Sequence, residues 1–198
     1  MNESNQSPRT VCVYCGASPN VAQEYKDIAR KTGKALAREG IRVVYGGGRS
    51  GLMGIVADSA LTDGAKVIGI IPGHIDKREI RHEELSELHV VDSMHERKSM
   101  MAERTDIFVV LPGGCGTMDE FFEILTWRQI GLHDKPILIL NEMGYWDPLL
   151  ELLAHIKTQK FMKEKDFDLF NVFTNLEDMM KYIKDVQVTN KPVHEELM

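Results

Sequence analysis

One stretch constrains the fold of this chain more than any other: residues 109–120, which read VVLPGGCGTMDE. The apolar start predicts a buried strand, and the glycines predict a tight turn into a helix that carries Glu120 in its first turns. Backbone N–H groups at a helix N-terminus have no partner within the helix, and the helix dipole adds partial positive charge there. The stretch therefore predicts an anion site beside a carboxylate. A plain turn in which Glu120 only complements the dipole would give the same pattern.

Short apolar runs alternate with amphipathic stretches along the rest of the chain. Strands are expected at residues 11–14, 41–45, 66–71, 107–111 and 136–140, with a weaker element near 170–173. Helices are expected at residues 23–39, 52–61, 117–130, 146–157 and 176–185. This alternation predicts an α/β fold, with a parallel sheet and helices on both of its faces. Ligands of such sheets bind beyond the carboxyl ends of the strands, where the glycine turns fall.

Length and composition fit one globular domain. The chain has 198 residues, of which 43% are hydrophobic and 27% are charged. We expect the domain to span residues 10–187, with flexible ends at residues 1–9 and 188–198. The net charge of −6 argues against a nucleic-acid partner. No apolar run approaches the roughly 20 residues of a membrane span, and the polar N-terminus lacks a signal core, so a cytoplasmic location is expected.

Cysteines and histidines predict neither a disulfide framework nor a metal site. Cys12 and Cys15 fall in and just after a strand, where a structural role is expected. Cys115 lies near a helix N-terminus, but no histidine is placed to serve it as a base, so no nucleophilic role is expected for it. The histidines lack metal-ligand spacing, and we expect neither a metal nor a cofactor.

A second glycine cluster, residues 45–54 (YGGGRSGLMG), contains a Gly-x-Gly-x-x-Gly match. Dinucleotide-binding fingerprints normally follow the first strand, and a carboxylate ends the next strand. Here the cluster follows the second strand, and the third ends without a carboxylate. Gly46, Gly47 and Gly48 are therefore candidates for close backbone approach to a smaller nucleotide, or for a turn that packs helix on sheet.

A basic pair follows a predicted helix start. Ser93 and Glu96 have capping-box spacing, so a helix is expected to begin at Ser93. Arg97 and Lys98 then oppose the helix dipole, which suggests an anionic partner, although a solvated pair is the alternative. Glu79 lies in a loop at the same sheet edge and is either a ligand contact or a surface carboxylate.

Together these motifs resemble the LOG family of cytokinin riboside 5′-monophosphate phosphoribohydrolases. The resemblance runs from Val11 to about Phe161. It includes residues 46–54, 94–98 and 112–120, and further matches at 126–127, 131–136 and 144–145. It implies a Rossmann-like, doubly wound sheet and a homodimer whose active site lies near the interface. The reaction implied is hydrolysis of the N-glycosidic bond of a nucleoside 5′-monophosphate to a free base and ribose 5-phosphate. Many members were formerly labelled lysine decarboxylases, but this sequence lacks the constellation of a pyridoxal-phosphate lysine site.

The resemblance also assigns roles to positions of this chain. Arg97 and Glu120 match the catalytic pair. The matching nucleotide contacts are Glu79, Lys98, Gly114, Cys115, Gly116, Thr117, Met118, Asp119 and Thr126. Gly46, Gly47, Gly48 and Ser18 are further candidates for phosphate or ribose contacts.

The implied reaction predicts one role for Glu120 and two alternative roles for Arg97. Cleavage of an N-glycosidic bond builds positive charge on the sugar, which a nearby carboxylate stabilises while it orients or deprotonates water. Arg97 either holds Glu120 ionised, by lowering the pKa of its carboxyl, or contacts phosphate or ribose oxygens.

The substrate is less constrained. An N6-prenyl adenine needs an apolar pocket, for which the candidates are Met94, Met101, Met118 and Trp127, although such residues are more often core. An N6-modified adenosine monophosphate is the first expectation, and a general AMP nucleosidase is an alternative. The alternative from another class is a non-catalytic carrier of a nucleotide or of a molybdenum cofactor.

Overall fold

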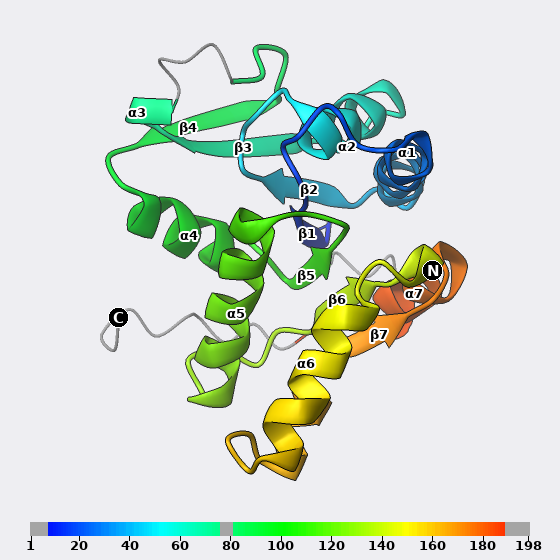
Figure 1. Ribbon diagram of the computed structural model, residues 1–198. Helices are drawn as coiled ribbons and strands as arrows, with labels where there is room; N and C mark the ends of the chain where they lie inside the picture. The colour runs from blue at the N-terminus through cyan, green and yellow to red at the C-terminus, as the bar shows by residue number, and fades with distance from the viewer. Residues whose placement is uncertain (1–7, 76–80, 189–198) are drawn as a thin grey trace, which may run out of the picture.

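The computed structural model describes residues 8–75 and 81–188, which form one parallel seven-stranded sheet in the order β4-β3-β2-β1-β5-β6-β7 (Figure 1). The strands are β1 (Thr10–Tyr14), β2 (Arg42–Tyr45), β3 (Val67–Pro72), β4 (Glu87–Val91), β5 (Ile107–Val110), β6 (Ile137–Leu140) and β7 (Asn171–Phe173). Every neighbouring pair runs parallel. The α/β class and the doubly wound, Rossmann-like sheet are confirmed.

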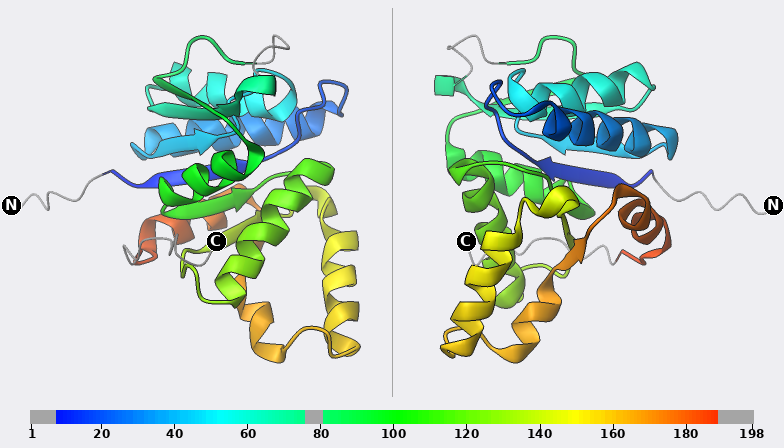
Figure 2. Two further views of the ribbon diagram at one scale, coloured as in Figure 1. Left: turned by 90° about the vertical axis from the view of Figure 1, so that its left-hand side faces the viewer. Right: turned by 45° about the vertical axis from the view of Figure 1, so that its right-hand side comes forward.

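Helices cover both faces of the sheet. They are α1 (Gln23–Arg38), α2 (Gly51–Thr62), α3 (Gly73–Ile75), α4 (Met94–Glu103), α5 (Cys115–Gln129), α6 (Asp147–Thr158) and α7 (Leu176–Asp185), with short 3₁₀ turns η2 (Glu142–Gly144) and η3 (Glu164–Leu169). The core cluster on one face joins α1, α2 and α7, and the cluster on the other joins α4, α5 and α6 (Figure 2). Among the described residues, no helix combines the length and the apolar character needed to cross a membrane.

Alternation along the strands divides the core between the two faces. In β1, Val11 and Val13 face the α1 side, whereas Cys12 and Tyr14 face the α4 side. Successive side chains of a strand point to opposite faces, so a strand that is covered on both sides is apolar throughout. This is why the central strands read as continuous apolar runs.

The winding reverses at β1, which lies between β2 and β5. The loops that leave β1 and β5 must therefore diverge to opposite faces, and a crevice opens between them at the carboxyl edge. The two loops touch at their start, where the Gly16 amide donates to the Pro112 carbonyl over 3.0 Å. The switch point of this sheet is thus built from the first and fifth strands.

Most expected elements are present with ends shifted by one or two residues, and α5 begins two residues earlier than expected. Three short elements, α3, η2 and η3, were not expected from the sequence, and neither was one strand, β4. Its five residues ELHVV lie at the edge of the sheet and are mostly half-buried or exposed, so they carry no apolar run. The expected flexible ends fall largely outside the described residues and stay predictions.

Candidate active site

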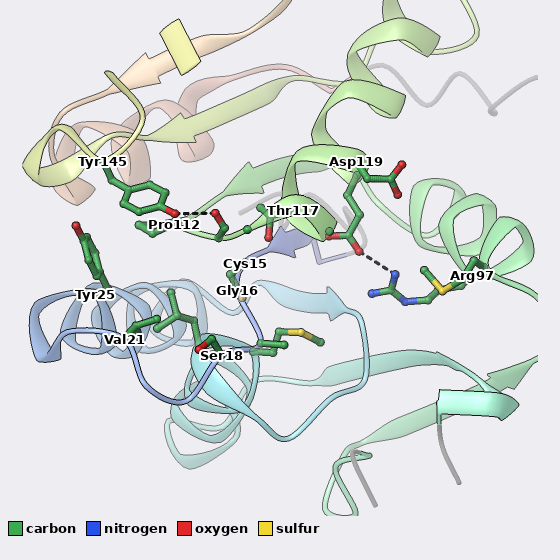
Figure 3. Close-up of a pocket in the computed structure, with 18 residues that line it drawn as sticks. Cys15, Gly16, Ser18, Val21, Tyr25, Arg97, Pro112, Thr117, Asp119 and Tyr145 are labelled. Atoms are coloured by element: carbon green, nitrogen blue, oxygen red, sulfur yellow. Dashed lines mark hydrogen bonds and ion pairs between the residues drawn. The ribbon is translucent and has the colours of Figure 1, made fainter. Parts of the chain in front are cut away.

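A pocket of about 470 Å³ lies at the switch point, in the size range of small-molecule sites (Figure 3). Its walls come from the β1 loop, the first turns of α1, α2, α4 and α5, the β5 loop and the segment after β6. The lining residues are Cys15, Gly16, Ala17, Ser18, Val21, Tyr25, Leu52, Met53, Met94, Arg97, Pro112, Gly113, Gly114, Gly116, Thr117, Asp119, Glu120 and Tyr145.

The turn from β5 into α5 needs its glycines for two different reasons. A side chain on Gly113 would collide with Thr117, so the absence of a Cβ allows the turn to close. Gly114 and Gly116 border open space and are exposed. Gly114 is the N-cap of α5, and its helix end receives no side-chain cap. The first N–H groups of α5 therefore face the pocket region without a side-chain partner, as an anion site requires.

The loop after β1 is held against the start of α2. Gly51 has a φ of +63°, and a side chain there would run into the backbone of Ala17 and Ser18. The Leu52 amide donates to the Gly16 carbonyl over 2.9 Å. This contact fixes Ser18 on the wall opposite the glycine turn (Figure 3).

Arg97 and Glu120 meet inside the pocket. Arg97 Nη1 lies 2.9 Å from Glu120 Oε1, and the two side chains are only 10% and 9% exposed. Arg97 Nε also donates to the Ile70 carbonyl at 3.2 Å, which anchors the guanidinium to β3. The predicted start of α4 places Arg97 in the first turn of this helix. The Ser93 hydroxyl caps α4 by accepting a hydrogen bond from the Glu96 amide at 3.1 Å. The Glu96 carboxylate accepts from the Asp92 amide instead of closing the box on Ser93.

Gly46 makes room for the guanidinium. A Cβ on Gly46 would overlap Arg97 Nη2 and would also press on Met53. Gly47 packs against β3, and Gly48 pairs with Arg81 in an isolated bridge. Gly46, Gly47 and Gly48 thus do not line the pocket, whereas Leu52 and Met53, at the end of the same cluster, do.

The electrostatics of Glu120 differ from the simple expectation for a carboxylate beside a cation. Burial raises the pKa of the Glu120 carboxyl above its ordinary value, and the Arg97 guanidinium opposes this rise without cancelling it. Asp119 adds to the rise and Lys98 reduces it. The net pKa is therefore raised, because desolvation of the carboxylate outweighs its ion pair.

Lys98 is occupied by acidic neighbours on α5. Its Nζ lies 2.8 Å from Glu123 Oε1 and 3.3 Å from Asp119 Oδ2. Burial acts to lower the pKa of Lys98, but these two carboxylates outweigh it and hold that pKa above its ordinary value. Lys98 does not line the pocket, so its approach to a ligand would have to break this network.

The remaining predicted residues divide into two groups. The pocket lining includes Ser18, Gly114, Gly116, Thr117 and Asp119, together with the catalytic candidates Arg97 and Glu120. The lining does not include Gly46, Gly47, Gly48, Lys98, Cys115, Met118 or Thr126. Cys115 and Thr126 are exposed, and Met118 packs against the α4-side core. Glu79 lies outside the described residues.

An aromatic end of the pocket was missed from the sequence. Tyr25 and Tyr145 lie at the end away from Arg97, with ring centroids 5.2 Å apart and nearly perpendicular planes (Figure 3). The Tyr145 hydroxyl donates to the Gly113 carbonyl at 2.7 Å. Tyr25 sits in the first turn of α1, where no local pattern distinguishes a pocket residue from a surface tyrosine.

Burial corrects the prediction that Met94, Met101, Met118 and Trp127 line a pocket for the base. Of the four, Met94 lines the pocket. Met101 is fully buried and Trp127 is 8% exposed, and both belong to the core beneath α4 and α5. Their helical spacing places them on the faces that pack on the sheet.

The two strand cysteines are structural, as expected. Cys12 and Cys15 are buried free thiols, and burial raises the pKa of each. A thiol in such surroundings stays protonated and unreactive. Cys15 therefore contributes only its shape to the pocket wall.

Comparison with known proteins identifies relatives over most of the chain. The family model described as "Possible lysine decarboxylase" matches residues 53–183. A cytokinin riboside 5′-monophosphate phosphoribohydrolase of Rhodococcoides fascians is 46% identical over 161 residues, which are 81% of this chain and 81% of that protein. A protein of the same name from Arabidopsis thaliana is 37% identical over 177 residues, covering 89% of this chain and 83% of the relative.

Solved structures show the same fold at lower identity. The molybdenum cofactor carrier protein of Chlamydomonas reinhardtii superposes with a TM-score of 0.67 over 90% of this chain and 97% of its own, at 20% identity. The molybdenum cofactor binding protein of Rippkaea orientalis gives 0.69 over 91% of this chain and 98% of its own, at 18% identity. These likenesses concern the fold alone. The family model, by contrast, spans residues 53–183, and the two relatives cover more than four-fifths of the chain at 37–46% identity; this chain therefore belongs to the LOG family, the group that the possible lysine decarboxylase model describes.

Proposed function

We propose that this chain is a phosphoribohydrolase that hydrolyses the N-glycosidic bond of an adenosine 5′-monophosphate, N6-modified or plain. The products are the free base and ribose 5-phosphate. The observation that carries the proposal is the buried pair of Arg97 and Glu120, 2.9 Å apart, with Glu120 in the second turn of a helix whose N-terminus has no side-chain cap. The names of the close relatives point to the same reaction.

In the proposed mechanism the phosphate and the sugar are held by different parts of α5. The 5′-phosphate is bound by backbone N–H groups at Gly114, Gly116 and Thr117, where the helix dipole favours an anion. Anchoring the phosphate there brings the sugar next to Glu120 and so fixes the orientation of the bond to be cleaved. Ser18, on the opposite wall, offers a hydroxyl to the phosphate or the ribose.

Glu120 stabilises the developing oxocarbenium ion and takes a proton from the water whose oxygen bonds to C1′ as the bond to the base breaks. The departing base takes up a proton from solvent, and Glu120 releases its own to solvent, so that one water is consumed in each turnover. Both tasks require the ionised form, and burial works against that form. Arg97 opposes this effect of burial by direct contact, and the bond to the Ile70 carbonyl keeps the guanidinium in place. This assigns Arg97 chiefly to holding Glu120 ionised.

A carrier function is the second candidate, because the structural neighbours of this fold include molybdenum cofactor carriers. A passive anion site gains nothing from a buried carboxylate whose charge repels the ligand. The Arg97–Glu120 pair therefore favours the hydrolase.

Product analysis decides between the two candidates. Purified protein is incubated with AMP, isopentenyladenosine monophosphate and other nucleoside monophosphates, and products are separated by chromatography. We expect free base and ribose 5-phosphate in equal amounts, and a 10²–10⁴-fold lower kcat in Glu120→Gln, which keeps the shape but cannot accept a proton. Glu151→Gln, the same change at an exposed position of α6 outside the pocket lining, is the matched control. Release of no base from any nucleotide, or near-normal turnover in Glu120→Gln, would overturn the proposal.

The chain is further proposed to act as a cytoplasmic homodimer. The dimer is supported by the family relationship, and light scattering should give twice the mass of one chain. The location is supported by the cysteines, since all three are free thiols, as in reducing compartments.

A further inference from the structure

Tyr145 is held in place from several sides. It follows η2, whose residues Met143 and Gly144 have φ values of +65° and +72°. The Asn141 side chain organises this turn, because its Oδ1 accepts from the Trp146 amide and its Nδ2 donates to Asp147 Oδ1, each over 2.7 Å. The Tyr145 ring packs near-perpendicular to Trp146 at 4.9 Å and to Tyr25 at 5.2 Å. The hydroxyl of Tyr145 is thus presented in a fixed direction.

That hydroxyl donates to the Gly113 carbonyl over 2.7 Å. The carbonyl belongs to the same peptide group as the Gly114 N–H. Because the peptide is planar and trans, its C=O and N–H point in opposite directions. Fixing the carbonyl toward Tyr145 therefore directs the Gly114 N–H away from Tyr145. This N–H hydrogen-bonds to nothing in the described part of the chain, so it is available to a ligand.

A peptide between two glycines is unusually free to turn over, since neither residue has a Cβ to restrict its dihedral angles. A turned-over Gly113–Gly114 peptide would present a carbonyl oxygen where the N–H had been. An oxygen repels an anion that the N–H would bind. The bond from Tyr145 selects the orientation in which the N–H remains available.

We propose that Tyr145 is a positioning residue that locks the Gly113–Gly114 peptide for binding the phosphate of the substrate. This inference rests on the proposed function, because it takes the anion at the start of α5 to be the 5′-phosphate. Tyr145 acts through the turn and need not touch the reacting atoms.

The test is Tyr145→Phe, which keeps the ring packing and removes only the hydroxyl. We expect the affinity for ribose 5-phosphate and for AMP, measured by calorimetry, to fall by about 3- to 10-fold, the usual worth of one hydrogen bond. KM for AMP should rise by the same factor while kcat stays within about 2-fold, because the phosphate is bound equally in the ground and transition states. A merely structural role would instead lower the melting temperature and leave the affinity for anions unchanged.

Tyr182→Phe is the matched control, because it removes the same hydroxyl from α7, outside the pocket lining, where the Tyr182 ring packs against Phe173. We expect its ligand affinities to equal those of the wild type. If the wild type binds AMP and Tyr145→Phe binds it as tightly, the positioning role is overturned while the hydrolase stands. If the wild type neither binds nor hydrolyses any nucleotide, the proposed function fails and this inference fails with it.

Discussion

Arg97 and Glu120 belong to different helices, and both charged groups are largely removed from water where they form their ion pair in the pocket. Removal of a carboxylate from water favours its neutral form, and an adjacent guanidinium favours the charged form. In this pocket the first effect is larger, so the pKa of Glu120 is raised. The contact of Glu120 with Arg97 is what limits the rise. Burial and the ion pair thus act in opposite directions on a base that must be ionised.

This balance predicts an acid limb in the pH profile of kcat/KM. Activity should fall as the pH drops through the raised pKa of Glu120, above the 4.5 of an ordinary glutamate. Arg97→Gln removes the opposing cation, so the limb should move to higher pH, with the greatest loss at low pH and partial recovery at alkaline pH. Arg97→Lys keeps a positive charge and should shift the limb less. Steady-state rates across the pH range test this prediction. An acid limb that does not move in Arg97→Gln would show that Arg97 does not control the ionisation of Glu120.

At the scale of secondary-structure elements, the connection between α5 and β6 contains a buried histidine. His133 Nε2 donates to the Ile124 carbonyl at 2.8 Å, while Nδ1 accepts from the Lys135 amide at 3.2 Å. Both ring nitrogens are therefore satisfied in the neutral form. Burial lowers the pKa of His133 to about 4, and a second proton would face the Lys135 N–H. The two hydrogen bonds that hold the α5–β6 connection to His133 therefore require the neutral imidazole.

The pH dependence of stability follows from that shift. The unfolded chain binds a proton at His133 below its ordinary pKa of 6.5, whereas the folded chain does so only near 4. Stability should therefore decline as the pH falls from 6.5 to 4, by at most about 3 kcal/mol from this group. His133→Gln, which cannot be protonated, should lose less stability than the wild type over this interval. Urea unfolding at several pH values measures the free energy of unfolding, with His155→Gln, at an exposed position, as the control. If that free energy changed equally with pH in all three proteins, protonation of His133 would not be the cause of the decline.

Across the whole molecule, the pocket joins parts of the chain that are far apart in sequence. Its walls extend from Cys15 after β1 to Tyr145 after β6 and draw on both helical layers. A ligand in the pocket therefore contacts both layers, and its binding free energy adds to the stability of the entire fold.

This coupling predicts a thermal shift. Glu120→Gln should bind AMP without consuming it, and at 100 times the Kd the ligand adds about 2.7 kcal/mol of stability. For a chain of this length the melting temperature should rise by roughly 5–10 °C. Adenosine, which lacks the phosphate, should raise it much less at the same concentration. Equal shifts with the two ligands would show that the start of α5 does not bind the phosphate.

The sequence alone determined most of the elements and their order along the chain, because apolar runs, glycine turns and capping residues act over a few neighbouring positions. It also predicted an anion site at the start of α5 and marked Arg97 and Lys98, in a capped helix, and Glu120, after the glycine turn, as candidates. The resemblance to the LOG family then paired Arg97 with Glu120. It missed β4, since an edge strand that is partly exposed needs no apolar run.

Only the tertiary structure decided which of these residues meet. The reversal of the winding at β1 brings the loops after β1 and β5 together, and that depends on the order of strands, which no local pattern specifies. It also separated Met94, in the pocket, from Met101, in the core, and brought Tyr145 onto the Gly113 carbonyl. The direction of the pKa shift of Glu120 was likewise settled by burial, because desolvation depends on everything packed around a group and not on its neighbours in sequence.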